Sequence, residues 1–361
     1  MAKEGQLAFL CLMFHFFMSH FANASKVPAI FILGDSTADV GTNSYLNRSH
    51  AKANFPYHGI DFPGHRATGR FSNGFNSADY LAMLMGARRS PSSYLFLQTL
   101  GSHRRADVLR RGANFASAGS GILDSTGSTL GVLPLYKQIL QLVEVYGDLE
   151  ARLGRHTTKT LLGKSLFFIT TGSNDIFGYF ATNTTVSVDE YIDTLIDSYD
   201  TYIRSLYGIG ARKFGIISVP PVGCCPSQRI ISPTGDCFEP ANQMAQLFHS
   251  KLVKLLCKLS SQLQDLRYSL GNAYEMTMNV INHPNLYGFT NVNTACCGKG
   301  KLNAEQSCNV TSNLCPDRTK YLFWDLFHPT QAAANLAAIT LYSGPAEYVT
   351  PINFKQLQNI K

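Results

Sequence analysis

The 361-residue sequence lacks several features, and each absence excludes a class of protein. Charged residues make up only 15% of the chain and form no long run of one sign, which excludes an acidic or basic tail. No stretch beyond residue 24 approaches the roughly 20 apolar residues that a membrane span needs. No low-complexity linker or repeat divides the sequence, so we expect a single domain over residues 25–361.

An apolar run near the N-terminus is too short to be a membrane span. It extends from Leu7 to Met18, follows Lys3, and is followed by the small-residue pattern Ala22-Asn23-Ala24. This order of segments is typical of a secretory signal peptide, which we predict over residues 1–24. An amphipathic or buried first helix is the alternative interpretation.

The net charge of +7 is not concentrated anywhere in the sequence. Arginine pairs occur at residues 88–89, 104–105 and 110–111, but no basic stripe joins them. A nucleic-acid-binding protein would normally gather its charge on one face, so we expect no nucleic-acid partner. Mild basicity instead favours contact with anionic surfaces such as cell-wall polymers.

Cysteine is absent between residues 12 and 223, and eight cysteines follow. Their spacing lacks the paired CxxC framework of a zinc site, and an oxidising compartment favours disulfides. We predict that Cys224 bonds to Cys237, and that Cys296 and Cys297 bond to Cys308 and Cys315 in an order left open. Cys257 is predicted to be a buried thiol on the apolar face of a helix, and Cys225 has no predicted partner. No metal site is expected.

Short apolar runs alternate with amphipathic patterns along the chain. This alternation predicts a parallel β-sheet covered by helices on both faces. The runs lie at residues 29–36, 166–175 and 213–223, and the helical patterns at residues 187–210 and 241–266, with a last helix after residues 328–330. Ser187 and Glu190 form a capping-box pattern at the start of the first of these helices.

The first apolar run ends in the sequence GDSTAD, which places Ser36 where a turn must begin. In open α/β sheets, ligands bind beyond the carboxyl ends of the strands, so Ser36 is a candidate functional residue. Helix capping by Asp35, Ser36 and Thr37 would explain the same three residues. The motif alone does not separate the two interpretations.

Three further stretches strengthen the functional interpretation. They are GANFASAGSGIL at residues 112–123, TTGSNDIF at residues 170–177 and WDLFHPT at residues 324–330. Ester chemistry needs a serine, a general base, and an acid that fixes the tautomer of the base; His328 and Asp325 can supply the last two. The main-chain N–H groups of Ser36 and Gly119 and the amide of Asn174 can bind the developing oxyanion.

Together these stretches resemble the plant GDSL esterase/lipase family of the SGNH hydrolase superfamily, along nearly the whole chain after residue 24. The resemblance implies a flavodoxin-like three-layer α/β/α sandwich with a mainly parallel sheet. It also implies a catalytic triad of Ser36, Asp325 and His328, and an oxyanion hole of Ser36, Gly119 and Asn174. No cofactor is implied. The family's leucine after the serine is replaced here by Thr37, a departure that bears on the shape of the substrate site and not on its chemistry.

The resemblance predicts a secreted serine esterase of the apoplast or cell wall that acts as a monomer, with the Golgi or vacuole as alternative locations. Its ester would be an acyl lipid or an acetyl ester of a wall polysaccharide. An acyltransferase using the same triad and an inactive binding protein are the alternatives. The GxSxG motif of conventional α/β-hydrolases does not occur in the sequence.

Several polar residues near these motifs are interpreted as structural. Asp35 and Asp175 are predicted to accept hydrogen bonds, since a triad needs only one acid. Asp39 and Asn43 are predicted to brace the loop after Ser36. Arg70 and Asn73 fit either substrate contact or a turn. The triplets at Asn47, Asn183 and Asn309 are candidate glycosylation sites.

Overall fold

A computed structural model describes residues 27–182 and 184–360 of the chain. The predicted signal peptide and the triplet at Asn183 lie outside the described residues. Within these ranges, no helix combines the length and the apolar character that crossing a membrane requires.

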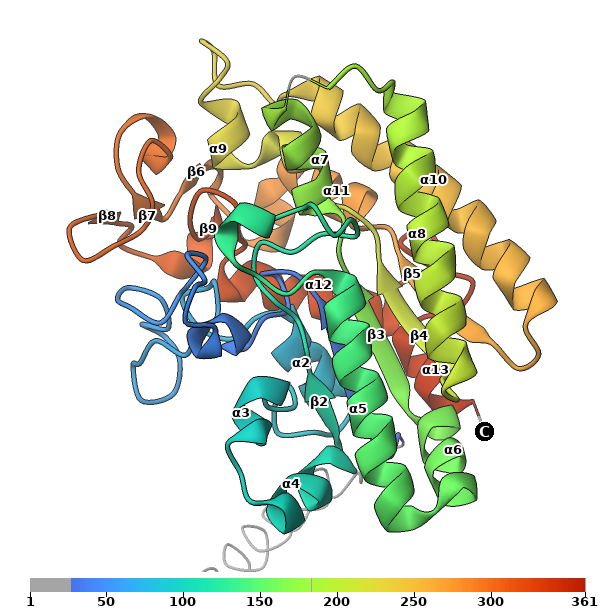
Figure 1. Cartoon of the computed structure of the whole chain (residues 1–361). Helices are drawn as coiled ribbons and strands as arrows, with labels where there is room; N and C mark the ends of the chain where they lie inside the picture. Colours follow the sequence, from blue (N-terminus) through green and yellow to red (C-terminus); the bar gives the residue numbers. More distant parts are fainter. Residues whose placement is uncertain (1–26, 183, 361) are drawn as a thin grey trace, which may run out of the picture.

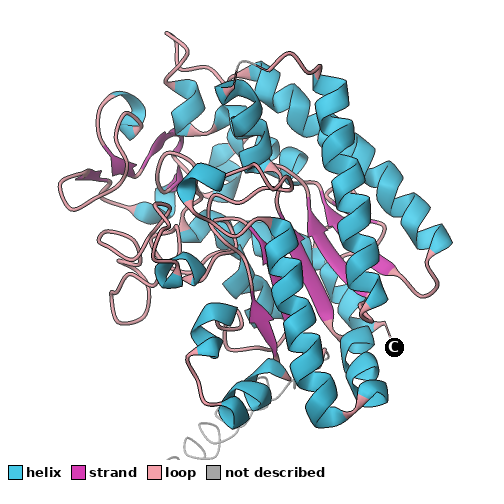
Figure 2. Cartoon of the chain, viewed as in Figure 1, coloured by secondary structure: helices cyan, strands magenta, loops and turns pink. Residues whose placement is uncertain are grey.

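A six-stranded sheet forms the centre of the fold (Figure 2). Its strand order is β10-β5-β4-β3-β1-β2, and every neighbouring pair is parallel except β10 and β5. The parallel strands are β1 (Ile30–Gly34), β2 (Gly112–Asn114), β3 (Leu166–Thr170), β4 (Lys213–Ile217) and β5 (Arg267–Gly271), and the antiparallel edge strand is β10 (Val349–Thr350). Their buried, continuous apolar sequences match a sheet covered on both faces.

Helices cover both faces of the sheet and complete three layers (Figure 1). One face is covered by α5 (Leu135–Leu153), α6 (Arg155–Lys164), α8 (Val188–Gly208) and α10 (Glu239–Gln262). The other is covered by α2 (Ser77–Leu84), α12 (Gln331–Ser343) and α13 (Phe354–Asn359). Alternate residues of β1 pack on opposite sides: Phe31 joins the first core and Ile32 the second. The predicted three-layer α/β/α fold is confirmed.

The remaining elements are short and lie mostly around the carboxyl ends of the strands. The helices are α3 (Tyr94–Gln98), α4 (Ser102–Leu109), α7 (Ser173–Ala181), α9 (Pro226–Arg229) and α11 (Ala273–Asn282). Two small sheets pair β6 (Asn291–Ala295) with β9 (Tyr321–Phe323) and β7 (Cys297–Gly298) with β8 (Asn313–Leu314).

Two predictions about helices need correction. The helix after residues 328–330 is not the last one, because α13 follows it; six residues carry too little periodic signal to be found. Cys257 is exposed, because the buried stripe of α10 runs through Leu252, Leu256 and Leu259 and leaves it outside. The predicted capping box is half formed: the Ser187 hydroxyl accepts a hydrogen bond from the Glu190 N–H, but in the described part of the chain the Glu190 side chain does not accept the Ser187 N–H in return.

The predicted disulfides form, and the structure gives their pairing. The bonds join Cys224 to Cys237, Cys296 to Cys315, and Cys297 to Cys308. The last four cysteines pack around Trp324, which is fully buried. They therefore hold the region of β7 and β8 against the segment that leads to Asp325.

Candidate active site

A cavity of about 570 Å³ opens where the carboxyl ends of the strands meet, and it brings four predicted residues together. Ser36, Gly119, Asn174 and His328 all line it. Ser36 reaches this position because β1 ends in a turn at Gly34, whose φ of 147° suits glycine. A Cβ atom at Gly34 would lie 2.1 Å from the main-chain oxygen of Thr170, so no side chain fits there.

Asp325 and His328 form a buried pair in the loop between β9 and α12. The Nδ1 of His328 lies 2.8 Å from Oδ1 and 2.9 Å from Oδ2 of Asp325. The same Oδ1 accepts the N–H groups of Phe327 and His328, which closes the loop around the carboxylate. Burial alone would raise the pKa of Asp325, but the charge and hydrogen bond of His328 lower it below its ordinary value. Asp325 is therefore held as an anion next to the imidazole.

Ser36 and His328 line the same cavity, and in the described part of the chain no direct hydrogen bond joins them. Such a bond often tightens only when substrate binds. The position of Ser36 also leaves its main-chain N–H free. Neither this N–H nor that of Gly119 donates to any group among the described residues.

The segment that carries Gly119 is held in place by two buried carboxylates. Asp39 accepts the N–H of Ala118 on one side of Gly119, and Asp175 accepts the N–H groups of Ile122 and Leu123 on the other. Burial raises the pKa of both carboxyl groups to about 6, although their hydrogen bonds oppose the shift. Both carboxylates thus fix the direction of the main chain at Gly119.

The amide of Asn174 is oriented in a similar way. It lies in the first turn of α7, and its Nδ2 donates to the main-chain oxygen of Ser120 at 2.9 Å. An amide nitrogen has two N–H donors, so the second remains for the cavity. Gly119, Ser120 and Asn174 therefore form one connected unit.

Asp35 and the residues around it hold the turn at Ser36. The Asp35 carboxylate accepts the N–H and the hydroxyl of Thr37 at 2.9 and 2.7 Å. Burial raises the pKa of Asp35, and among the described residues no basic side chain forms a hydrogen bond or ion pair with it, which agrees with the predicted structural role. Asn43 donates to the main-chain oxygens of Ala51 and Ala118. The predicted bracing by Asp39 and Asn43 is present, and it extends to the Gly119 segment as well.

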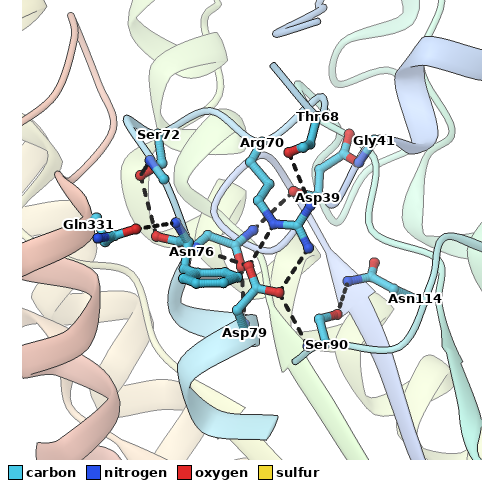
Figure 3. A network of polar contacts seen from close by, with 12 residues as sticks. Asp39, Gly41, Thr68, Arg70, Ser72, Asn76, Asp79, Ser90, Asn114 and Gln331 are labelled. Atoms are coloured by element: carbon cyan, nitrogen blue, oxygen red, sulfur yellow. Dashed lines mark hydrogen bonds and ion pairs between the residues drawn. The ribbon is translucent and has the colours of Figure 1, made fainter. Parts of the chain in front are cut away.

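Arg70 and Asn73 do not line the Ser36 cavity. Arg70 forms a buried ion pair with Asp79 at 2.6 Å, at the centre of the polar network in Figure 3. Asn73 donates to Asp61 and accepts the N–H of Gln331, both at 2.7 Å. Of the two interpretations of the sequence, the structural one holds for both residues with respect to this cavity.

Aromatic contacts behind His328 were not found from the sequence. The ring of Phe71 lies 4.9 Å from the imidazole of His328. Next to Phe71, the buried His58 accepts a hydrogen bond at its Nδ1 from the Trp324 indole at 3.1 Å. Burial lowers the pKa of His58 to about 4, so it is neutral at pH 7. No spacing signal links residues 58, 71 and 324, because only the fold brings them together.

The rest of the cavity is mainly apolar and extends across the sheet edge. It passes from Ser36 after β1 to Ala273 after β5, which is three strand intervals or about 14 Å. Its walls come from the strands, α11, β9 and α12. They include Phe168, Ile217, Met276, Val280, Leu322 and Leu336.

Comparison with known proteins gives a consistent result. The profile of the family described as GDSL-like lipase/acylhydrolase matches residues 30–341. Among similar proteins of Arabidopsis thaliana, GDSL esterase/lipase At5g55050 is 36% identical over 92% of this chain and 90% of its own length. GDSL esterase/lipase LTL1 is 35% identical over 96% of this chain and 95% of its own length. GDSL esterase/lipase At4g16230 is 34% identical over 98% of both chains.

Proposed function

This chain belongs to the GDSL-like lipase/acylhydrolase family and is a carboxylic ester hydrolase, and we propose that it acts through an acyl-enzyme on Ser36. His328 takes the Ser36 proton at Nε2 while the hydroxyl oxygen attacks the ester carbonyl. The Asp325 carboxylate accepts a hydrogen bond from the Nδ1–H of His328, which fixes the tautomer and stabilises the imidazolium. The protonated His328 then returns a proton to the departing alcohol.

The second half of the reaction repeats these steps with water. His328 removes a proton from a water molecule that attacks the acyl carbon, and the acid leaves as the Ser36 hydroxyl is restored. In both halves the N–H groups of Ser36 and Gly119 and the Nδ2 of Asn174 bind the oxyanion. The hydrogen bonds that Asp39 and Asp175 accept from Ala118 and Ile122 support the proposed oxyanion hole, because they hold the Gly119 segment in place before substrate binds.

The observation that carries the proposal is the buried Asp325–His328 pair facing the same cavity as Ser36. These residues come from opposite ends of the sequence, and helix capping by Ser36 does not explain their convergence. The free N–H groups beside Ser36 add the donors that ester cleavage requires.

The shape of the cavity favours an acyl chain over an acetyl group. An acetyl group would leave most of the apolar walls between Ser36 and α12 in contact with water. Each buried methylene contributes about 0.8 kcal/mol, or roughly a fourfold gain in binding. We therefore expect kcat/KM to rise with acyl length until the chain spans the cavity.

The test is hydrolysis of p-nitrophenyl esters from acetate to palmitate by the native protein and by Ser36→Ala. We expect Ser36→Ala to lower kcat by about 10⁴-fold or more at every length. Ser261→Ala, which changes an exposed serine at the end of α10, is the control. Full activity of Ser36→Ala would contradict the triad. Ester formation from an added alcohol would indicate acyl transfer by the same site.

We also propose that residues 1–24 are removed and that residues 25–361 are secreted as one domain. Three disulfides support an oxidising compartment. The sequon at Asn47 is exposed and thus open to glycosylation. N-terminal sequencing of the protein recovered from the medium tests the cleavage site, and a start at Met1 would contradict it.

A further inference from the structure

A second cavity, of about 370 Å³, lies beside the first and has a different chemical character. It is enclosed by residues 40–45, residues 62–70 and residues 89–96. The chain between Gly41 and Asn54 separates the two cavities: it lines this one with Gly41 and Asn54 and the Ser36 cavity with Ala51. The volume of the second cavity lies within the range of small-molecule binding sites, which is about 300 to 1,000 Å³.

The charged residues that line this cavity are all arginines. Arg66, Arg70 and Arg89 contribute to its wall, and the wall contains no aspartate or glutamate among the described residues. Asp79 lies behind Arg70 and neutralises that one guanidinium. The two others keep their charge, so the cavity presents a net positive potential to an entering group.

Arg70 lines the cavity and is held in place by the polar network drawn in Figure 3. Its Nε and Nη2 donate to Asp79 at 2.6 and 2.8 Å, and its Nη1 donates to Thr68 at 3.1 Å. A guanidinium has five N–H donors, and within the described chain these contacts use three of them. Two donors of a 5% exposed arginine thus remain for a ligand.

Arg66 and Arg89 supply the unpaired guanidinium groups of the site. Both are exposed, and neither takes part in an ion pair or a side-chain hydrogen bond within the described ranges. A guanidinium binds a carboxylate through two parallel N–H···O hydrogen bonds. Each of these unpaired arginine side chains is therefore suited to bind a carboxylate of a ligand.

The remaining wall is suited to a sugar ring. Hydroxyl groups of Ser44, Thr68 and Ser92 line the cavity. Two aromatic rings, those of Tyr45 and Phe96, lie 6.2 Å apart at the rim and are 45% and 39% exposed. Ring faces of this kind can cover the C–H face of a sugar, while hydroxyls and guanidinium groups bind its polar edge.

We infer that this cavity binds a uronate unit of an acidic polysaccharide, with Arg66 and Arg89 on its carboxylate and Tyr45 and Phe96 against its ring. A phosphate ion would use the arginines but not the aromatic rim. A lipid headgroup would need an apolar surround for its chains, whereas the hydroxyl-bearing wall is polar. The inference does not depend on the proposed role of Ser36, because no residue lines both cavities.

The experiment measures the binding of an octamer of α-1,4-linked galacturonate to the full protein by calorimetry. Arg66→Ala with Arg89→Ala should raise Kd by about tenfold for each lost guanidinium. Arg66→Lys with Arg89→Lys keeps the charge but loses the planar guanidinium. Its Kd should lie between those of the native protein and the double alanine variant. The matched control, Arg104→Ala with Arg110→Ala, removes two exposed arginines of the α4 region and should leave Kd unchanged.

Three other ligands test the assignment of the uronate. A neutral galactan octamer should bind at least tenfold more weakly, and inorganic phosphate should compete poorly. Equal binding of the neutral octamer, or an unchanged Kd in Arg66→Ala with Arg89→Ala, would overturn the inference. Binding to vesicles of anionic phospholipid that these two substitutions abolish, without binding to galacturonate, would instead assign the site to a membrane surface. Hydrolysis of p-nitrophenyl acetate should stay unchanged in these variants, so a failure here is distinct from a failure of the triad.

Discussion

Asp325 and Asp175 are both buried carboxylates within the same site, yet their surroundings shift their pKa values in opposite directions. Asp325 faces His328, and the electrostatic interaction and hydrogen bond with this imidazole lower the pKa of Asp325 despite burial. Asp175 is surrounded by neutral donors, namely main-chain N–H groups and the hydroxyl of Thr126, and burial raises its pKa to about 6. Asp39, with main-chain donors only, behaves like Asp175.

The contrast separates two uses of a buried carboxylate. Hydrogen bonds from neutral groups orient a carboxylate but do not fully replace the water lost on burial. A partner that becomes cationic orients the carboxylate and also replaces the lost water. The carboxylate in turn stabilises the positive charge that develops on this partner. In this protein the first kind holds the main chain around Gly119, and the second kind supports the base that the reaction needs.

The largest expected effect comes from removing the charge of Asp325. Asp325→Asn keeps the size of the side chain but leaves the imidazolium unstabilised and its tautomer unfixed, so kcat on p-nitrophenyl esters should fall by about 10⁴-fold. Asp317→Asn changes an exposed acid eight residues away in sequence and serves as the control. A loss of less than tenfold in Asp325→Asn would contradict the role of Asp325 in the triad.

A second effect concerns the pH dependence of stability. The pKa of Asp175 is about 6 in the folded chain and near 3.8 when unfolded, so the folded state binds more protons between these values. The free energy of unfolding should therefore decrease as the pH rises from 4 to 6. For this one group the decrease is on the order of 3 kcal/mol.

Urea unfolding of the native protein and of Asp175→Asn from pH 4 to pH 7 measures this difference. Asp175→Asn loses a hydrogen bond at every pH, but it should also lack the decrease caused by titration. Asp197→Asn, on the exposed face of α8, should keep the native slope. Parallel curves for the native protein and Asp175→Asn would show that the carboxyl group does not titrate in this range.

The smallest effect is expected at His58, which accepts a hydrogen bond from Trp324, the residue before Asp325. His58→Phe leaves the indole N–H of Trp324 without its acceptor and should lower the free energy of unfolding at pH 7 by about 1 to 3 kcal/mol. His58→Gln offers an oxygen to the same N–H and should restore most of the loss. Equal stability of the two variants would mean that the hydrogen bond contributes nothing measurable.

The sequence predicts the parts of this protein whose signals are local. Strands β1, β3 and β4 are continuous apolar runs that end at a turn, and Asp325 lies three residues before His328, so a single loop can hold both. By contrast, β2 has three residues and β10 has two, which is too short for any period to appear.

The contacts that tune the site are long-range and have no local signal. Asp39 reaches Ala118, and Trp324 reaches His58, only because the fold brings distant segments together. The direction of a pKa shift depends on these partners, so it could not be predicted for Asp39 or Asp175. The exposure of Cys257 was predicted wrongly for a related reason: a helix has one buried stripe, and a small residue next to it fits either side.

The three disulfides link residues only 11 to 19 positions apart, and none of them joins two strands of the central sheet. Reduction would thus leave the sheet and its helices without a lost covalent bond, while it would free the loops packed around Trp324, next to Asp325. The fold and the catalytic loop therefore differ in their dependence on redox conditions. A chain folded under reducing conditions should assemble its sheet, yet align the acid and base of its site only after oxidation.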